Sequence, residues 1–401
     1  MSVVLVINSG SSSIKYRLLE MDGEHTLAAG LIERIGASGS VLTHRGESRD
    51  SDQEQSIERD VPDHSAGFAL MLEAFGRFGP SLESKPPVAV GHRVVHGGQR
   101  FFEPILVTEA VKRDIEELGE LAPLHNAANL QGIVAAENAF PDVPHVVVFD
   151  TAFHRTLPPE AYSYAIDATI AARHRIRRYG FHGTSHKYVS EAAAAFLRRP
   201  LEQLRQIVFH LGNGASACAV SGGRSVETSM GLTPLEGLVM GTRSGDLDPA
   251  IVFHLHRRLG AGFDELDELL NRRSGLLGLS GHADMRDVQS AADAGHAASA
   301  LALQVYAHRI RSYLGAYLVH LGGLDVVCFT AGVGEHAARV RELAMAGLEH
   351  LGIVLDRERN ALPGGGVRRI SAEGSAVEVL VVPTDEEVEI ARQTLGLVAP
   401  A

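Results

Sequence analysis

The chain has 401 residues, which is too long for one ordinary hydrophobic core and predicts two domains. Hydrophobic residues make up 45% of it and charged residues 21%, which excludes a disordered chain. A net charge of −12 argues against an extended surface for nucleic acid or an anionic membrane, so we expect neither as a partner. Local arginines for a small anionic substrate stay compatible with that charge.

The first apolar run, Ser2 to Ile7, is shorter than the apolar core of a secretion signal, and no later run reaches the length of a membrane span. We therefore expect a cytoplasmic protein. Cys218 and Cys328 stand in apolar, strand-like runs, so buried reduced thiols are favoured over a disulfide or a redox pair.

The chain opens with a predicted hairpin, in which Ser2 to Ile7 and Ile14 to Leu19 are strands and Asn8 to Ser13 is the turn. The turn holds only small residues, which let backbone amides approach a phosphate or a hydrated metal closely. A plain turn is the alternative. No GxxxxGK[ST] motif occurs in the sequence, which excludes a P-loop nucleotidase.

Helical spacing of apolar residues predicts helices over Ser65 to Phe78 and Thr108 to Leu121, and Val88 to Val95 reads as a strand between them. Arg93 interrupts that strand. Its side chain either extends along apolar surface to reach water or faces a pocket, and the sequence favours neither. His125 stands where the chain restarts as a helix after a break, as a capping residue or a functional one.

A buried strand ends at Asp150 within Val146 to His154, and the carboxyl end of a strand is where open α/β sheets bind ligands. In Tyr179 to His186, we expect a short loop that presents Phe181 and His182 at the start of a helix capped by Thr184 or Ser185. Such a helix start suits anions.

A second strand, small turn and strand arrangement begins at Gln206 to Leu211, which predicts two similar halves. The Gly-rich segment Ser229 to Pro249 follows, before a predicted helix at Ala250 to Leu259. Long irregular loops in compact domains are often functional, so Arg243 is a candidate for binding an anion.

A long helix is predicted from about Ala297 to Leu321, and then a strand from Leu324 to Thr330. AGVGEH follows, and we expect its glycines to precede a helix that opens at about Ala337. A last strand, Val377 to Val382, leads through PTDEE into a closing helix. Glu386 and Glu387 in that first helical turn suit the helix dipole whether or not they have a further role.

Two histidine pairs, His92 with His96 and His182 with His186, have the spacing at which a helix offers two zinc ligands. Neither stretch reads as helical throughout, and the sequence has no HExxH motif, so a structural zinc is disfavoured.

Ten motifs in order resemble those of the acetate kinase family, within the sugar kinase, heat-shock ATPase and actin superfamily, over essentially the full length. They are NSGSSSIK (Asn8 to Lys15), GHRVVHGG (Gly91 to Gly98), PLHN (Pro123 to Asn126), VFDTAFH (Val148 to His154), YGFHGTSH (Tyr179 to His186), HLGNGAS (His210 to Ser216), GTRSGDLDP (Gly241 to Pro249), DMRDV (Asp284 to Val288), FTAGVGE (Phe329 to Glu335) and PTDEE (Pro383 to Glu387).

This resemblance implies an α/β, two-domain actin-like ATPase (ribonuclease H-like) fold, each domain a mixed sheet flanked by helices. It implies an N-terminal acetate kinase domain of residues 1–152 plus 387–401 and a C-terminal nucleotide-binding domain of residues 153–386. The activity implied is reversible, Mg²⁺-dependent transfer of the ATP γ-phosphoryl group to acetate, giving acetyl phosphate and ADP, usually in a homodimer. Mn²⁺ is an alternative to Mg²⁺.

The resemblance also assigns site residues. It implies that Arg93 holds the substrate carboxylate, that Val95, Leu124, Phe181 and Pro234 surround the methyl group, and that Asp150, His182, Arg243 and His125 are catalytic. Asn8 and Glu386 are implied to hold magnesium together with Asp150. The implied nucleotide residues are Lys15, His210, Leu211, Gly212, Asn213, Gly214, Asp284, Met285, Arg286, Gly332, Val333, Gly334, Glu335 and His336.

The chemistry questions one of these roles. The family treats Asp150 as an acid or base, yet a carboxylic acid with a pKa of about 4 to 5 is already ionised at pH 7 and needs no base. We hypothesise that Asp150 acts chiefly through magnesium and by positioning an arginine.

Three stretches depart from the family pattern: Ala127 and Ala128 replace prolines, Gly281 to Asp284 replaces a Ser-Ser-Asp segment, and His336 with Ala337 replaces Asn-Ser. The last two belong to the implied nucleotide pocket, so the phosphoryl donor stays open. Propionate kinase is the near alternative, because one methylene changes discrimination by only about 1 to 3 kcal/mol. An ATP-gated module of the actin or chaperone type is the alternative from another class.

Overall fold

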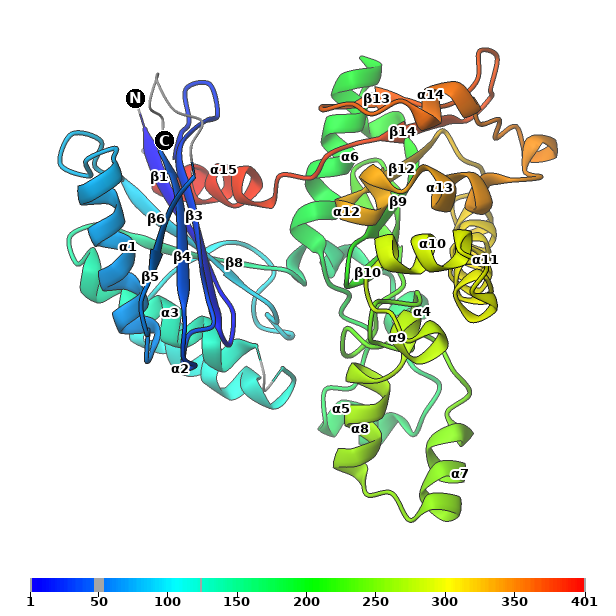
Figure 1. The fold of residues 1–401 in the computed structure, drawn as a ribbon, viewed down its shortest axis with the longest axis horizontal. Helices are drawn as coiled ribbons and strands as arrows, with labels where there is room; N and C mark the ends of the chain where they lie inside the picture. The colour runs from blue at the N-terminus through cyan, green and yellow to red at the C-terminus, as the bar shows by residue number, and fades with distance from the viewer. Residues whose placement is uncertain (1, 47–53, 123–124, 400–401) are drawn as a thin grey trace. The chain divides into compact units, whose positions relative to one another are not determined.

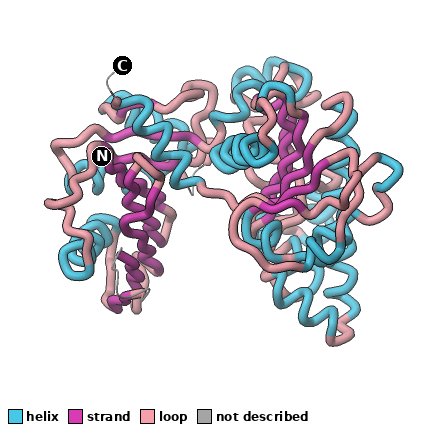
Figure 2. The backbone as a smooth tube through the Cα atoms, turned by 90° about the horizontal axis from the view of Figure 1, so that it is seen from above, coloured by secondary structure: helices cyan, strands magenta, loops and turns pink. Residues whose placement is uncertain are grey.

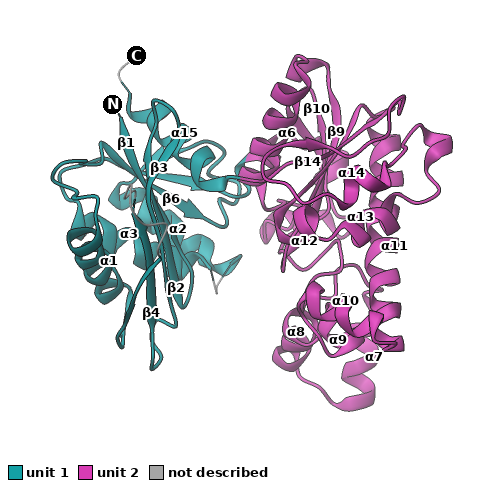
Figure 3. Ribbon diagram, turned by 45° about the horizontal axis from the view of Figure 1, so that its top comes forward, with its two compact units in different colours: residues 1–152, 385–401 teal, residues 153–384 magenta. Residues whose placement is uncertain are grey.

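The computed structural model describes residues 2–46, 54–122 and 125–399, which form two compact units. Unit 1 consists of residues 1–152 and 385–401, and unit 2 of residues 153–384 (Figure 3). The chain re-enters unit 1 at residue 385, two residues earlier than the implied re-entry at residue 387. The reason is local, because the side chain of Asp385 accepts a hydrogen bond from the amide of Val388 and so caps the closing helix.

Unit 1 is built on an eight-stranded sheet of order β5-β4-β3-β2-β1-β6-β8-β7. Its central strands β1, β6 and β8 are parallel, whereas β1 and β2 form the antiparallel opening hairpin that the sequence predicts. The strands are β1 (Val3–Ser9), β2 (Ser13–Glu20), β3 (His25–Glu33), β4 (Val41–Gly46), β5 (Gln55–Glu58), β6 (Ala89–Val94), β7 (Ile105–Leu106) and β8 (His145–Phe149).

Helices cover both faces of this sheet (Figures 1 and 2). Leu5 and Ile7 of β1 pack in one core with Phe68 of α1 and Ala136 of α3. The other face receives α15, and Gly91 leaves room for it there, because a Cβ at Gly91 would lie 2.4 Å from Thr394 Oγ1. The helices of unit 1 are α1 (His64–Phe78), α2 (Glu109–Glu117), the 3-10 helix η1 (Leu118–Glu120), α3 (Asn126–Ala139) and α15 (Glu386–Val398).

Unit 2 repeats the arrangement with a six-stranded sheet of order β11-β10-β9-β12-β14-β13. Strands β9, β12 and β14 are parallel, and β10 pairs antiparallel with β9, as β2 does with β1. The prediction of two similar halves is therefore confirmed. The strands are β9 (Arg205–Leu211), β10 (Ala215–Ser221), β11 (Arg224–Thr228), β12 (Val326–Thr330), β13 (Arg368–Arg369) and β14 (Glu378–Val381).

The two faces of this second sheet are also covered. Val208 and Cys328 pack with Val189 and Ala193 of α6 on one face, and α11 contacts β9 and β10. The unit's elements are η2 (Ala152–Thr156), which begins at the last residue of unit 1, α4 (Pro159–Tyr162), α5 (Ala168–Arg173), α6 (Gly183–Leu197), η3 (Leu201–Gln203), α7 (Ala250–Leu259), α8 (Phe263–Arg272), α9 (Gly275–Ser280), α10 (Met285–Asp293), α11 (Ala297–His320), α12 (Ala331–His336), α13 (Ala338–Met345), η4 (Glu349–Leu351) and α14 (Arg357–Ala361).

Two local predictions differ from the structure. The helix expected at about Ala337 is present as α13, which begins at Ala338, but AGVGEH before it is not a loop, because the stretch is itself helix α12, which begins at Ala331 directly after β12. Neither Thr184 nor Ser185 caps α6. The residue at the cap position is His182, in a left-handed conformation, and both hydroxyl residues are buried in the first turn.

Cys218 and Cys328 are free, buried thiols, as predicted. Among the described residues, none of the helices combines the length and the apolar character that crossing a membrane requires. The same residues also contain no group of three or more His, Cys, Asp or Glu side chains placed to hold a metal ion.

Candidate active site

In unit 1, three of the predicted site residues stand at the carboxyl ends of neighbouring parallel strands. Asn8 is near the end of β1, Arg93 near the end of β6, and Asp150 directly follows β8. The register places Ile7 beside His92 and Arg93 beside Val148. These side chains therefore come from one edge of the sheet, the edge where parallel α/β sheets bind ligands.

Arg93 and Asp150 form a two-point ion pair at this edge. The Nε of Arg93 donates to Oδ1 of Asp150 at 3.1 Å, and its Nη2 donates to Oδ2. The carboxylate of Glu386 lies 3.8 Å from the same Nε. Burial alone would lower the pKa of Arg93, but the charges of Asp150 and Glu386 outweigh burial and hold that pKa above its ordinary value.

The two glutamates at the start of α15 differ in their surroundings. Burial raises the pKa of Glu386 to about 7, although the charge of Arg93 lowers it and those of Asp150 and Glu387 raise it further. Glu387 is also buried, but its ion pair with Lys15, at 2.5 Å, keeps its pKa below the ordinary value. Lys15, one of the implied nucleotide residues, therefore lies in unit 1 beside Glu387.

The loop after β6 is held by side chains that sequence reasoning did not single out. Asn129 of α3 accepts a hydrogen bond from the amide of Val95 and donates to the carbonyl of Ser9 at 2.6 Å. Asn126 bonds both backbone groups of His96. The implied substrate residue Val95 is buried in this loop, and the motifs around it are thereby joined to β1 and α3.

The predicted catalytic residue His125 and the predicted wall residue Leu124 belong to the segment that leads into α3. His125 is exposed at the N-cap position of α3, where its side chain makes no capping hydrogen bond to the helix. Leu124, the implied wall of the substrate pocket, lies outside the described residues, as does Pro123. The remaining wall residues, Phe181 and Pro234, belong to unit 2.

In unit 2, His182 sits at the start of α6 with a φ of 55°, a conformation that costs a residue with a Cβ on the order of 1 kcal/mol or more. Phe181 before it is buried, and its carbonyl accepts a hydrogen bond from His154 Nε2 at 2.9 Å. The ring of His182 stacks on that of His210 at the end of β9, with centroids 4.2 Å apart.

A serine connects two of these histidines. Ser216 Oγ lies 2.9 Å from Nδ1 of His182 and 2.8 Å from Nε2 of His186. Burial holds the pKa of His186 well below its ordinary value, so its ring is neutral, and its buried Nδ1 has no partner among the described residues. A bare lone pair is the less costly group to bury there, so the proton belongs on Nε2.

This assignment fixes the direction of the chain of hydrogen bonds. His186 Nε2–H donates to Ser216, and the Ser216 hydroxyl donates to Nδ1 of His182. The proton of a neutral His182 then lies on Nε2. That nitrogen is 3.6 Å from the point where a Cβ of Gly214 would sit, over the small-residue turn.

Arg243 reaches the same point from the irregular segment 229–249. Its Nη1 is also 3.6 Å from the Cβ position at Gly214, and it donates to the carbonyl of Pro234 at 2.9 Å. Burial lowers its pKa, and no carboxylate among the described residues pairs with it. A half-buried guanidinium without a counter-ion, facing an imidazole N–H across a glycine, is suited to an anion.

Most of the implied nucleotide residues also meet in unit 2, around a cavity of about 390 Å³. Its lining residues are Gly212, Asn213, Asp284, Met285, Arg286, Gln289, Gly332, Val333, His336 and Ala337. Sequence reasoning named all of them as site residues except Gln289 and Ala337. The side chain and the amide of Arg286 both donate to Asp284 and lower its pKa to about 2.

Four other implied nucleotide residues of unit 2 do not line this cavity but adjoin residues that do. Two of them belong to the end of β9 and the turn that follows it, and the other two belong to α12. The amide of Gly212 donates to the carbonyl of Gly214 at 3.0 Å, which closes the turn after β9. The buried Arg341 of α13 donates to the carbonyls of Gly334 and Glu335. The residues concerned are Leu211, Gly214, Gly334 and Glu335; His210 stacks on His182 instead.

Solved structures of known kinases resemble this one over the whole chain. The acetate kinase of Porphyromonas gingivalis matches with a TM-score of 0.94 and 42% identity, covering 99% of this chain and 100% of that one. A propionate kinase from Francisella tularensis matches with a TM-score of 0.92 and 39% identity, with the same coverage. The protein is thus a kinase with the two-domain α/β fold of this superfamily.

The sequence comparisons are more specific. The model of the acetokinase family matches residues 3–392. Acetate kinases from Clavibacter michiganensis subsp. michiganensis and Streptomyces coelicolor are 64% and 56% identical to the chain. The first alignment covers 100% of both chains, and the second 99% of this chain and 97% of the other. The chain belongs to the acetokinase family.

The edge of the unit 1 sheet also fits the metal that this family implies. Magnesium prefers hard oxygen ligands, takes only one or two carboxylates, and keeps water and phosphate oxygens for its other positions. Asp150 and Glu386 both lie against Arg93, and Asn8 stands on the adjacent strand with an amide oxygen. Burial raises the pKa of Glu386, and the charges of Asp150 and Glu387 raise it further, so a cation bound beside this carboxylate would favour its ionised form.

Proposed function

We propose that the chain catalyses reversible transfer of the γ-phosphoryl group of ATP to acetate, forming acetyl phosphate and ADP. The observation that carries this proposal is the convergence of His182 and Arg243 beside Gly214, next to a cavity lined by the implied nucleotide residues. Phosphoryl transfer through a loose transition state needs donors and positive charge around three equatorial oxygens. An imidazole N–H and an uncompensated guanidinium supply both.

Arg93 is the proposed partner of the substrate carboxylate. Asp150 occupies the Nε and Nη2 side of its guanidinium, which leaves the edge that carries Nη1 for a second carboxylate. Acetate arrives ionised, so the acceptor oxygen needs no base. Asp150 then serves to hold Arg93 in one orientation and to take part in the metal site, and not to remove a proton.

Asn8, Asp150 and Glu386 are the residues that would hold Mg²⁺, directly or through water. When bound, the metal neutralises charge on the phosphate oxygens. Lys15 forms an ion pair with Glu387 and so leaves Glu386 without a lysine partner of its own among the described residues. We further propose a cytoplasmic homodimer that uses neither nucleic acid nor a membrane, because the acidic composition and the family resemblance favour it.

Propionate kinase is the second candidate, favoured by the likeness to the Francisella tularensis propionate kinase. An ATP-gated module is the candidate from another class, but it would give Arg93 and Phe181 no substrate. A panel of acetate, propionate and butyrate against ATP, GTP and pyrophosphate, with hydroxylamine to trap acyl phosphate, separates them. The proposal expects the highest kcat/KM for acetate with ATP. A preference for propionate by more than about tenfold would overturn the substrate assignment.

A further inference from the structure

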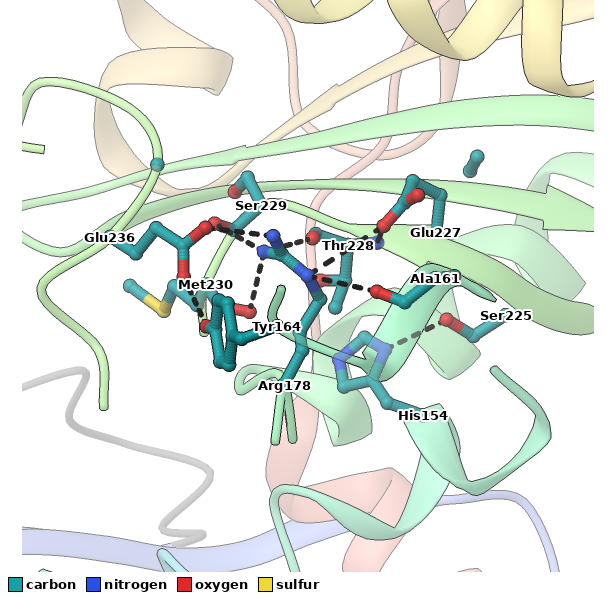
Figure 4. Close-up of polar contacts among 12 residues, drawn as sticks. His154, Ala161, Tyr164, Arg178, Ser225, Glu227, Thr228, Ser229, Met230 and Glu236 are labelled. Carbon is teal, nitrogen blue, oxygen red and sulfur yellow. Dashed lines mark hydrogen bonds and ion pairs between the residues drawn. The ribbon is translucent and has the colours of Figure 1, made fainter. Parts of the chain in front are cut away.

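Arg178 ties together the loop that carries Pro234. Its Nη2 lies 2.7 Å from Oε1 of Glu236, and its Nη1 donates to the backbone carbonyls of three consecutive residues, of which Thr228 at 2.9 Å is the nearest (Figure 4). Burial would lower the pKa of Arg178, but the charge of Glu236 outweighs it and raises that pKa. The guanidinium is therefore a fixed cation at the base of the Pro234 loop, which we define as residues 228–236.

Tyr164 holds the same loop from a second direction. Its hydroxyl donates to Oε2 of Glu236 and accepts a hydrogen bond from the amide of Leu232 at 3.1 Å (Figure 4). A Cβ at Gly231 would lie 1.9 Å from Glu236 Oε2 and 2.1 Å from the Tyr164 hydroxyl. The two side chains thus fill the space that the missing side chain of Gly231 leaves.

These contacts fix the chain on both sides of Pro234. Leu232, two residues before it, is held through its amide, and Glu236, two residues after it, through its carboxylate. Between them, the carbonyl of Pro234 accepts the hydrogen bond from Arg243 Nη1. A neutral carbonyl directs a guanidinium without neutralising it, so the charge of Arg243 stays available to an anion.

We propose that Tyr164, Arg178 and Glu236 are positioning residues that act on phosphoryl transfer through the Pro234 carbonyl and Arg243. The inference rests on the proposed function for its kinetic consequence. Its structural content is narrower: the direction of the Arg243 guanidinium depends on a partly buried cluster of Tyr164, Glu236 and Arg178 that does not itself reach the anion. Misplacing a catalytic group by about 1 Å costs roughly a hundredfold in rate, so loosening this cluster has a large predicted effect.

The test is a double-mutant cycle with Glu236→Gln and Tyr164→Phe, each in the wild-type and in the Arg243→Ala background. We expect kcat of each single variant to fall by about tenfold to a hundredfold with KM for ATP unchanged, and little further loss when Arg243 is already alanine. Equal losses in both backgrounds would overturn the inference, because the cluster would then act independently of Arg243.

A binding measurement covers the case in which Arg243→Ala turns over too slowly to assay. Orthovanadate, a phosphoryl mimic, is titrated calorimetrically into each variant in the presence of ADP and Mg²⁺. Glu236→Gln should weaken vanadate binding in the wild-type background and leave it unchanged beside Arg243→Ala. Unchanged binding in the wild-type background would contradict the inference. This readout needs no acetate, so it stays informative even if the wild-type protein forms no acyl phosphate.

Asp325→Asn is the matched control. Asp325 forms an ion pair with Arg205 at 3.1 Å and is 16% exposed, but it stands before β12, at the opposite end from Thr330 and the site. This variant should lower the thermal midpoint to an extent comparable with Glu236→Gln and leave kcat and vanadate binding unchanged. If Asp325→Asn lowered kcat by the same factor, the effect at Glu236 would be general destabilisation and the inference would fail.

Discussion

The carboxylate of Asp150 accepts hydrogen bonds from two nitrogens of Arg93, and it is almost wholly buried in doing so. Asp150→Asn keeps the shape but removes the charge, so we expect kcat to fall by about tenfold to a hundredfold while higher Mg²⁺ restores part of it. Measuring kcat as a function of Mg²⁺ concentration checks this. Loss of activity at saturating metal with unchanged metal affinity would instead support a proton-transfer role.

Ser216→Ala tests the assigned tautomer of His182. The Ser216→Ala change removes the hydroxyl that, by donating to Nδ1 of His182, keeps the proton on Nε2, and we expect about a tenfold loss of kcat with KM for acetate little changed. Ser371→Ala is the control, because Ser371 is equally buried and bonds Glu378 in the same unit. A Ser216→Ala enzyme with wild-type kcat would show that the tautomer is fixed in another way.

His92 makes the fold sensitive to acid. It is buried against His145, with Nε2 2.9 Å from Nδ1 of that ring, and burial followed by the charge of His145 holds the pKa of His92 well below its ordinary value. Between that lowered pKa and about 6.5, the unfolded chain binds the proton and the folded one does not. The stability that the neutral His92 contributes is therefore fully present above about pH 6.5 and is lost progressively as the pH falls below that value.

Thermal midpoints of the wild-type protein and a His92→Gln variant at pH 7.5 and 5.5 measure this contribution. The drop in thermal midpoint from pH 7.5 to pH 5.5 should be smaller for the variant than for the wild-type protein. The expected reduction is the few degrees that about 1 kcal/mol represents in a protein of this size. His308→Gln, at an exposed position on α11, should keep the wild-type difference. An unchanged difference in His92→Gln would mean that His92 is not a source of the acid sensitivity.

Cys218 should be unreactive in the folded protein. Burial raises the pKa of its thiol to about 12, and burial likewise raises the pKa of Cys328. Because the thiolate is the nucleophile, only on the order of one Cys218 in ten thousand is reactive at pH 8. Labelling with a chromogenic disulfide should proceed at the rate of unfolding and rise sharply in denaturant. Rapid labelling of either cysteine in the native protein would contradict this description of the core.

The sequence predicted the parts of this structure that depend on local pattern. Apolar alternation and turn chemistry identified both hairpins, and the run ending at Asp150 correctly placed a carboxylate at the end of a buried parallel strand. The resemblance named, as implied nucleotide residues, all of the residues that line the cavity of about 390 Å³ in unit 2 except Gln289 and Ala337.

What the sequence missed depends on contacts between distant segments. Asn129 reaches the carbonyl of Ser9 across 120 positions, and Tyr164 reaches Glu236 across 72. Neither residue carries a local signal, because an Asn on a helix and a Tyr in a loop are ordinary. The left-handed backbone of His182 also escaped prediction, since tertiary packing holds a histidine where a serine or threonine cap is the usual local choice.

The most direct test of the account is ADP release from ATP and Mg²⁺ with and without acetate, measured together with acyl phosphate trapped by hydroxylamine. The account predicts that turnover requires acetate, that each ADP is matched by one acyl hydroxamate, and that Arg243→Ala abolishes both signals in parallel. ADP release that proceeds equally without acetate and leaves no hydroxamate would contradict it.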